Sequence, residues 1–224
     1  MLNWKATLLG AALCLVTTAP TFAQTVGNVN LVKVWAYGRD SGNANWVDLY
    51  QSDPVLMAQA LRTPIGGAMH VRFTDDTDLR LGSEAEIVVD RFVFNPSTGV
   101  GALQAEIGKG VLRFITGRMQ KDGVRIGTPA AVIGVRGTDF IVLVAVDGTT
   151  TVQVIEGEVT ITPRSGGETA SIPAGQTAQV AMAATSVAVG VAPPAADPGV
   201  SENGGEGGDN GASDGGGGDG GGSH

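Results

Sequence analysis

The sequence predicts an all-β fold, an antiparallel β-sandwich or roll, with a jelly-roll-like arrangement and a short β-solenoid as the candidate architectures. Apolar and polar residues alternate with a period of two through much of the chain. Turn-forming residues recur at short intervals between these runs. A single helix is expected, at 55–61, where Pro54 follows Asp53 as a candidate N-cap. Strands are therefore favoured over helices in the body of the chain.

The clearest strand pair is predicted in residues 69–81. Residues 69–73 and 79–81 alternate apolar and polar side chains, and the polar residues 75–78 separate them. This is the pattern of two half-buried strands joined by a turn.

A hairpin is predicted where the β-branched runs 142–146 and 151–155 flank Asp147-Gly148. Asp-Gly favours a type I′ turn, which has positive φ at both central residues. Asp122-Gly123 and residues 165–167 indicate further turns.

Glycine interrupts the alternation of residues 100–116. One alternating run ends at Ile107, Gly108 and Gly110 follow, and a second run begins at Leu112. Because glycine inside a strand is typical of a bulge or bend, we expect these glycines to bend one strand into the next.

Residues 1–23 have the organisation of a secretory signal peptide. Lys5 precedes an apolar stretch at 6–16, and small residues lead to a predicted cleavage point after Ala23. An uncleaved membrane anchor is the alternative. Since Cys14 is the one cysteine of the chain, the mature protein has no disulfide.

We expect one folded domain after the signal peptide, with an N-terminal β part at 24–60 and a β core at 61–182. Residues 193–224 are rich in glycine and acidic residues and are predicted to be disordered. A fragment at 204–209 fits part of a calcium-binding nonapeptide repeat, but no second copy follows it. A flexible acidic tail is the main interpretation.

The net charge of −8 argues against a nucleic-acid partner, which would require a basic face. No segment beyond the signal peptide is long and apolar enough to span a bilayer, so no transmembrane anchor is expected after cleavage.

The most distinctive stretch is 128–140, which reads TPAAVIGVRGTDF. Arg136 stands between Gly134 and Gly137 in an otherwise apolar run, so its charge must reach solvent or find partners. A structural guanidinium, bonded to strand-end carbonyls or to Asp139, is one interpretation. Contact with a partner or ligand is the other. Thr128-Pro129 is expected to begin a strand.

This stretch resembles the core motif of the FecR domain family, and other landmarks agree in order and spacing. They are Arg62-Thr63 followed by FTDDTDLRLG at 73–82, the glycine-broken strand at 108–113, VIEGEV at 154–159 and IPAGQ at 172–176. The resemblance covers about residues 61–180. Asp76 departs from it, because the family has glycine there.

The resemblance implies a periplasmic β-domain whose motif residues are mainly structural. Carried onto this sequence, they are Thr128, Pro129, Gly134, Val135, Arg136, Gly137, Thr138, Phe140, Glu156, Gly157 and Gly175. The iron-citrate regulator that names the family joins this domain to a transmembrane helix and a cytoplasmic segment that controls a sigma factor. Here only an export signal is expected ahead of the domain, so sigma-factor control does not carry over directly.

Two groups outside the motif are candidate binding residues. Asp75, Asp76 and Asp78 could hold a cation with their hard oxygen ligands, although solvated turn acids are commoner. Trp35 and Trp46 could line a binding face or cap one end of the core.

Catalysis is not expected. His70 is predicted to be an exposed strand residue, and neither a nucleophile elbow nor a zinc-protease helix occurs in the sequence. The paired carboxylates of a glycosidase remain an alternative, because the distance between two such carboxylates depends on the fold.

The sequence thus predicts a non-catalytic, exported binding module of the periplasm or cell surface, without a cofactor, whose partner is an envelope protein or a small ligand. Signal sensing is one possible setting for such a module. A structural surface or matrix component with a flexible acidic tail is the alternative function.

Overall fold

The computed structural model describes residues 24–40, 45–120, 123–190 and 198. These residues form seventeen strands and no helix, which confirms the all-β prediction. No described residue therefore belongs to a helix that could cross a membrane. The predicted signal peptide and all of the predicted tail except Pro198 lie outside the described residues.

The strands are arranged in two layers. Sheet A runs in the spatial order β4 (Pro54–Leu56), β1 (Thr25–Lys33), β6 (Ala68–Phe73), β7 (Asp78–Leu81), the C-terminal half of β9 (Gly101–Ile115), β12 (Asp139–Val144), β13 (Thr150–Glu156), β16 (Thr177–Val180) and β17 (Ala188–Val189).

Sheet B runs in the order β3 (Val47–Asp48), β2 (Tyr37–Asp40), β5 (Gln59–Arg62), β8 (Glu86–Phe94), the N-terminal half of β9, β10 (Val124–Gly127), β11 (Ala131–Val135), β14 (Glu158–Pro163) and β15 (Ala170–Pro173).

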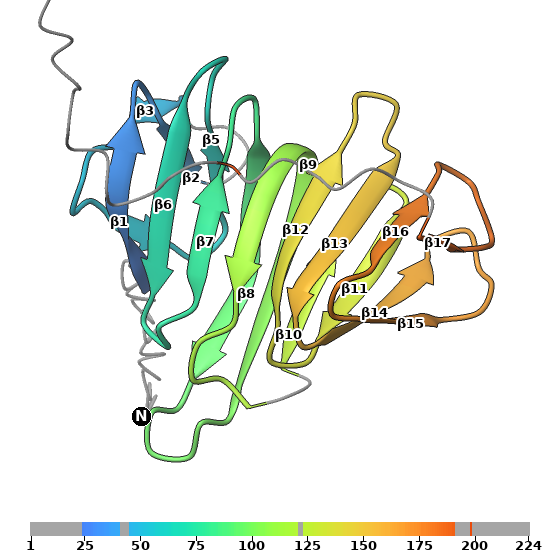
Figure 1. Ribbon diagram of the computed structural model, residues 1–224. Coiled ribbons are helices and arrows are strands. Elements are labelled where there is room, and N and C mark those ends of the chain that lie inside the picture. Colours follow the sequence, from blue (N-terminus) through green and yellow to red (C-terminus); the bar gives the residue numbers. More distant parts are fainter. Residues whose placement is uncertain (1–23, 41–44, 121–122, 191–197, 199–224) are drawn as a thin grey trace, which may run out of the picture.

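The chain advances along both layers together, from β1 at one end to β17 at the other (Figure 1). Successive hairpins alternate between the two sheets: β10–β11 belongs to sheet B, β12–β13 to sheet A, β14–β15 to sheet B and β16–β17 to sheet A. The strand pairs are antiparallel except β9–β10, which is parallel. The layers do not close into a barrel, so the architecture is a two-layer roll with a solenoid-like progression.

β9 crosses from one layer to the other. Leu103 to Glu106 pair with β10 in sheet B, and Gly110 to Ile115 pair with β12 in sheet A. Gly110 has φ of +95° and lies so close to Ala85 that a β-carbon would collide with it. The bend predicted at these glycines is confirmed.

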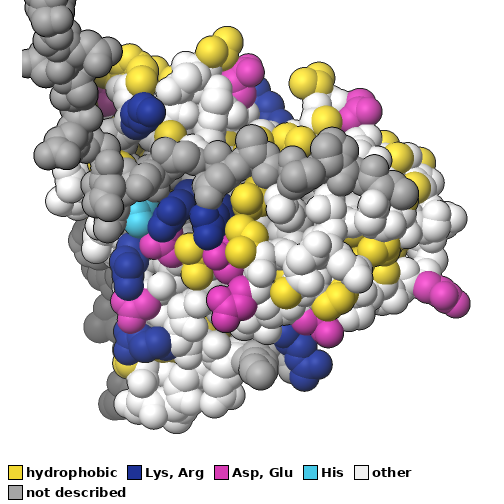
Figure 2. Space-filling model, viewed as in Figure 1, with side chains coloured by type: hydrophobic (Ala, Val, Ile, Leu, Met, Phe, Trp, Pro, Cys, Tyr) yellow, Lys and Arg dark blue, Asp and Glu magenta, His cyan; other side chains and the backbone are white. Residues whose placement is uncertain are grey.

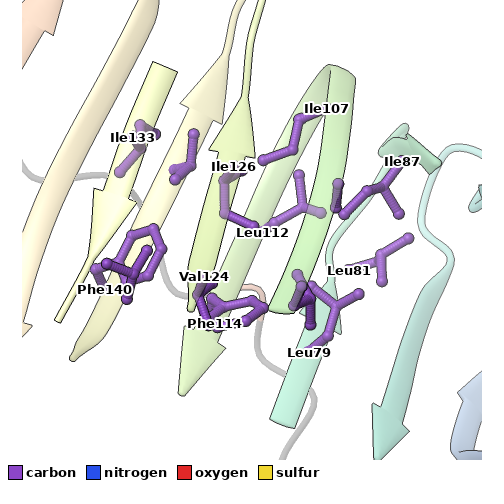
Figure 3. Close-up of a cluster of buried hydrophobic side chains, with 14 of the residues drawn as sticks. Leu79, Leu81, Ile87, Ile107, Leu112, Phe114, Val124, Ile126, Ile133 and Phe140 are labelled. Atoms are coloured by element: carbon purple, nitrogen blue, oxygen red, sulfur yellow. The ribbon is translucent and has the colours of Figure 1, made fainter. Parts of the chain in front are cut away.

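The core lies between the layers. Leu79, Leu112 and Phe140 of sheet A face Ile87 and Ile126 of sheet B (Figure 3), and each of these side chains is at most 1% exposed. Burying a side chain of this size contributes about 1.5–3 kcal/mol, so the core stabilises the fold without disulfides.

The strands at the borders of both sheets are short. β3 and β17 have two residues each, β4 begins at Pro54, and β15 ends at Pro173. Each of them pairs on one side only. Short strands and proline protect exposed edges against pairing with another chain.

Two sequence-based predictions of local structure are wrong. The helix expected at 55–61 is instead the end of β4, a turn and β5, because Val55 and Leu61 are both buried but belong to different layers. Ala58 takes φ of +62° in that turn.

The hairpin predicted at Asp147-Gly148 does join β12 to β13, but its turn is not type I′. Gly148 has φ of +81°, whereas Asp147 has no positive φ, and the Gly148 N–H donates to the carbonyl of Ala145 at 2.9 Å. Five residues, 145–149, connect the two strands in place of a two-residue loop.

Two crossings between the layers pack against each other. Residues 136–138 carry the chain from β11 to β12, and Gly157 carries it back from β13 to β14. Gly137 and Gly157 have φ of +64° and +80°. A β-carbon on Gly157 would lie 2.5 Å from the Gly137 carbonyl oxygen, whereas one on Gly137 would meet nothing within 4 Å.

This asymmetry can be tested with alanine at each glycine. Both substitutions place a β-carbon in the left-handed region, which costs about 1–2 kcal/mol. We expect Gly157→Ala to lower the free energy of unfolding in urea further than Gly137→Ala, by about 1 kcal/mol or more, because it adds a collision. Equal losses would contradict the packing of the two crossings.

Candidate functional site

Thr128 organises the turn between β10 and β11. Its buried hydroxyl accepts from the N–H of Ala131 at 3.0 Å and from the hydroxyl of Thr150 at 2.8 Å. Its carbonyl accepts from Arg164 Nε at 2.6 Å. Pro129 lies in this turn and β11 begins at Ala131, so the strand start expected at Thr128-Pro129 is wrong by two to three residues.

Three further motif residues connect the layers. Val135 and Phe140 are buried in the core, one from each sheet. Thr138 is buried between them, where its hydroxyl donates to the carbonyl of Glu158 at 2.8 Å and its N–H donates to Thr116 Oγ1 at 3.1 Å. These contacts fix the position of residues 136–138, which connect β11 to β12.

The remaining motif residues lie on the surface. Arg136 is exposed in the crossing between β11 and β12, and Glu156 is exposed at the end of β13. Gly175 takes φ of +81° in the turn before β16. Gly134 leaves a hollow of about 180 Å³ on sheet B, which Arg136 lines.

Asp139, one of the partners considered for Arg136, is held by Arg113. Arg113 Nε and Nη2 lie 3.0 and 2.7 Å from the two carboxylate oxygens of Asp139. This bidentate pair joins neighbouring strands β9 and β12 on the outer face of sheet A.

The three aspartates of residues 75–78 have separate roles. Asp75 is buried, and its carboxylate accepts from the Thr77 N–H at 3.0 Å and the Thr77 hydroxyl at 2.7 Å. Asp76 has φ of +67°, so it adopts the backbone conformation that the glycine of the family motif would favour. Its carboxylate lies 2.6 Å from Arg118 Nε and 3.5 Å from Arg72 Nε.

Asp78 lies in a second cluster, which Arg72 joins to the first, because Arg72 Nη1 is 3.8 Å from Asp78 Oδ2. Its Oδ2 lies 2.6 Å from His70 Nε2, and its Oδ1 accepts from Arg80 Nε at 3.0 Å. Burial by itself would raise the pKa of Asp78, but the contacts with His70 and Arg80 outweigh it and hold the pKa below its ordinary value. The exposed position predicted for His70 is wrong: it lies between Leu31 and Arg80 in the ladder and is 1% exposed.

These contacts leave no converging acid cluster. Within the described ranges, no group of three or more His, Cys, Asp or Glu side chains is arranged to hold a metal ion. Basic and acidic side chains alternate across this face of sheet A instead (Figure 2).

The two predicted tryptophans differ in their surroundings. Trp46 lies on the outer face of sheet B between the guanidinium groups of Arg39 and Arg62, at 4.5 and 4.2 Å from the ring centroid. Trp35 is 52% exposed in the loop after β1, where its carbonyl oxygen lies close to Gly67 of a neighbouring turn.

A depression in the described surface lies where β9 leaves sheet B. We call it the β9 notch. It has a volume of about 440 Å³ and is lined by Glu86, Ile87, Val88, Glu106, Ile107, Gly108, Thr128, Pro129 and Arg164. Ile87 and Ile107 are core residues, so the notch reaches down to the space between the layers.

Charged side chains border the notch. The Glu106 carboxylate lies over Gly127, whose missing side chain makes room for it. Arg164 Nη2 lies 2.6 Å from Glu106 Oε2. Glu86 borders the opposite side, on β8. Sequence reasoning singled out Gly108, Thr128 and Pro129 for separate reasons, and it missed this site because nothing local indicates that they meet.

Comparison with known proteins agrees with the position of the motif. Residues 59–160 match the family model described as FecR protein. These residues form a FecR domain. It extends from β5 into β14, and strands on both sides of it continue the same two sheets. The β9 notch lies in the FecR domain except for Arg164.

The chain is also similar to two crystal structures of a candidate anti-sigma factor from Parabacteroides distasonis ATCC 8503, solved at 2.50 and 1.65 Å resolution. The TM-scores are 0.47 and 0.45, with 17% identity, and each match covers 58% of this chain and 58% of that chain. No curated protein matches the chain.

The Asp78 cluster of the FecR domain makes its stability depend on pH. Folding lowers the pKa of Asp78, so the ionised carboxylate stabilises the fold above the unfolded pKa of about 4. This stabilisation is lost as pH falls through the pKa of the folded state. We expect Asp78→Asn to lower the free energy of unfolding by about 2 kcal/mol at pH 7. The difference from the wild type should shrink below about pH 4.

Urea denaturation over a pH series measures this effect. Asp76→Asn is the matched control, because that side chain is 46% exposed and its ion pairs should contribute less than about 1 kcal/mol. A loss for Asp78→Asn that is independent of pH would show that the cluster does not act through the charge of Asp78.

Proposed function

We propose that this chain is a non-catalytic, exported module that binds a protein partner in the cell envelope, with signal sensing as its setting. The observation that carries the proposal is a FecR domain whose two-layer frame holds an open, charge-bordered notch. A small ligand of the envelope is the second class of partner. No cofactor is part of the proposal.

The frame supports binding because its crossings are fixed by buried groups. Thr138 bonds to the backbone at these crossings, Thr128 holds the β10–β11 turn and bonds to Thr150 of sheet A, and the core continues beneath them. A rigid scaffold that positions loops and side chains is the usual basis of a recognition surface. His70, the one imidazole among the described residues, is closed off from solvent and so is poorly placed for acid–base chemistry in a cleft.

The alternative function, a structural surface or matrix component, would need repeated contacts between copies. Edge-to-edge addition of strands is a direct route to such assemblies, but the short, proline-bearing border strands of both sheets disfavour it. This observation favours the binding module over an assembly built through sheet edges.

Export is part of the proposal and has its own test. Strand β1 begins at Thr25, so cleavage after Ala23 would leave the first strand whole. We expect N-terminal sequencing of the protein from its native host to begin at Gln24 in the periplasmic or extracellular fraction. Recovery of the intact N-terminus in a membrane fraction would instead indicate an uncleaved anchor.

Affinity capture tests the binding function. The mature chain, immobilised and exposed to detergent-solubilised envelope extract, is expected to retain a specific protein identified by mass spectrometry. A synthetic peptide of residues 193–224 serves as the control bait, because its acidic residues can retain basic proteins non-specifically. If the mature chain retains no protein beyond this control while a polysaccharide array gives binding, the proposed function is wrong.

A further inference from the structure

We infer that the β9 notch is a binding site for a basic side chain, lysine or arginine, presented on an extended segment of a protein partner. This inference rests on the proposed binding function and names the site and the chemistry of its ligand. Three features of the notch carry it: free backbone on its inner wall, an apolar floor and carboxylates on both borders.

The backbone of β9 is unpaired along the notch. The ladder with β10 ends where Gly127 meets Glu106, and the ladder with β12 begins where Val144 meets Gly110. No described strand therefore pairs with residues 107–109 on the side away from β8. Backbone N–H and C=O groups at such a gap can bond a short extended segment, as in β-augmentation.

The floor of the notch is apolar. Ile87 and Ile107 form it, and Gly108 adds no side chain above them. A β-carbon at Gly108 would meet only the Glu86 carbonyl oxygen, at 3.9 Å, so the space over the floor is open. The methylene stem of lysine or arginine can cover such a surface while its charged end reaches the border.

Carboxylates border the floor on two strands. The Glu106 carboxylate lies over Gly127, and its Oε2 contacts Arg164. Its Oε1 is left as an acceptor for a ligand. Glu86 is half-buried and forms no ion pair among the described residues, although Lys109 lies opposite it in the ladder.

A cation is therefore the complementary group for this site. An acidic ligand would meet Glu86 and Glu106, and an uncharged apolar ligand would leave the half-buried Glu86 without a partner. The length of unpaired β9 backbone, about three residues, suits one side chain and its neighbours better than a whole added strand.

The test uses the mature chain and a defined probe. The methyl NMR signals of Ile87 and Ile107 are measured during titration with an acetylated peptide amide of alternating valine and lysine. The control peptide has glutamine in place of each lysine. We expect the lysine peptide to shift both methyl signals and to bind at least about tenfold more tightly than the glutamine peptide.

Two variants locate the contact. Glu86→Gln should weaken binding of the lysine peptide about fivefold to tenfold, and Gly108→Leu should abolish it by filling the open space above the floor. Glu156→Gln removes an exposed acid outside the notch and should leave the affinity unchanged. Circular dichroism checks that each variant is folded.

The outcomes separate the site from the function. No shift of either methyl signal, or equal affinity in Glu86→Gln, overturns the inference. The inference is also overturned if the Gly108→Leu variant captures the partner from envelope extract as fully as the wild type does. In that case the proposed binding function is still supported. If the wild type captures no partner, the proposed function itself fails.

Discussion

The two layers depend on one strand that belongs to both. β9 satisfies its backbone in sheet B through β8 and β10, and then in sheet A through β7 and β12. The change of layer requires Gly110, because a side chain there would occupy the position of Ala85. The notch is a consequence of this crossing. β9 moves away from sheet B just where β10 ends, and no strand fills the space between them.

Local patterns predicted those parts of the fold in which local contacts decide the structure. The strands in 69–81, the hairpin around Gly148 and the bend near Gly110 follow from alternation and glycine, which act over a few residues. The segment 55–61 shows the limit of such signals. Pro54 and Asp53 favour a helix start, yet the chain turns at Ala58 so that its apolar side chains can enter both layers. Tertiary burial outweighs the local preference there.

The charged contacts of the site could not be predicted, because their partners are distant in sequence. Arg113 and Asp139 are 26 residues apart, and Arg164 and Glu106 are 58 residues apart. Only the winding of the two sheets brings them together. The error over His70 has the same origin, since alternation indicates which face a residue occupies but not whether neighbouring strands cover it. The conformation of Asp76 was not predicted either: its departure from the family's glycine suggested a different turn, whereas its φ of +67° keeps the left-handed conformation that glycine favours.

The position of the notch bears on how a partner can be recognised. The border strands lie at the two ends of the stack, where short length and proline limit backbone pairing. The notch lies in the middle and, apart from Arg164, inside the residues that match the FecR family; β8, β9 and the turn before β11 line it. A ligand there would contact side chains whose positions are set by the core. A displacement of Ile87 or Ile107 at the notch would therefore alter the packing between both layers. Recognition at this point would use the most constrained part of the fold, whereas recognition at the ends would use its least constrained strands.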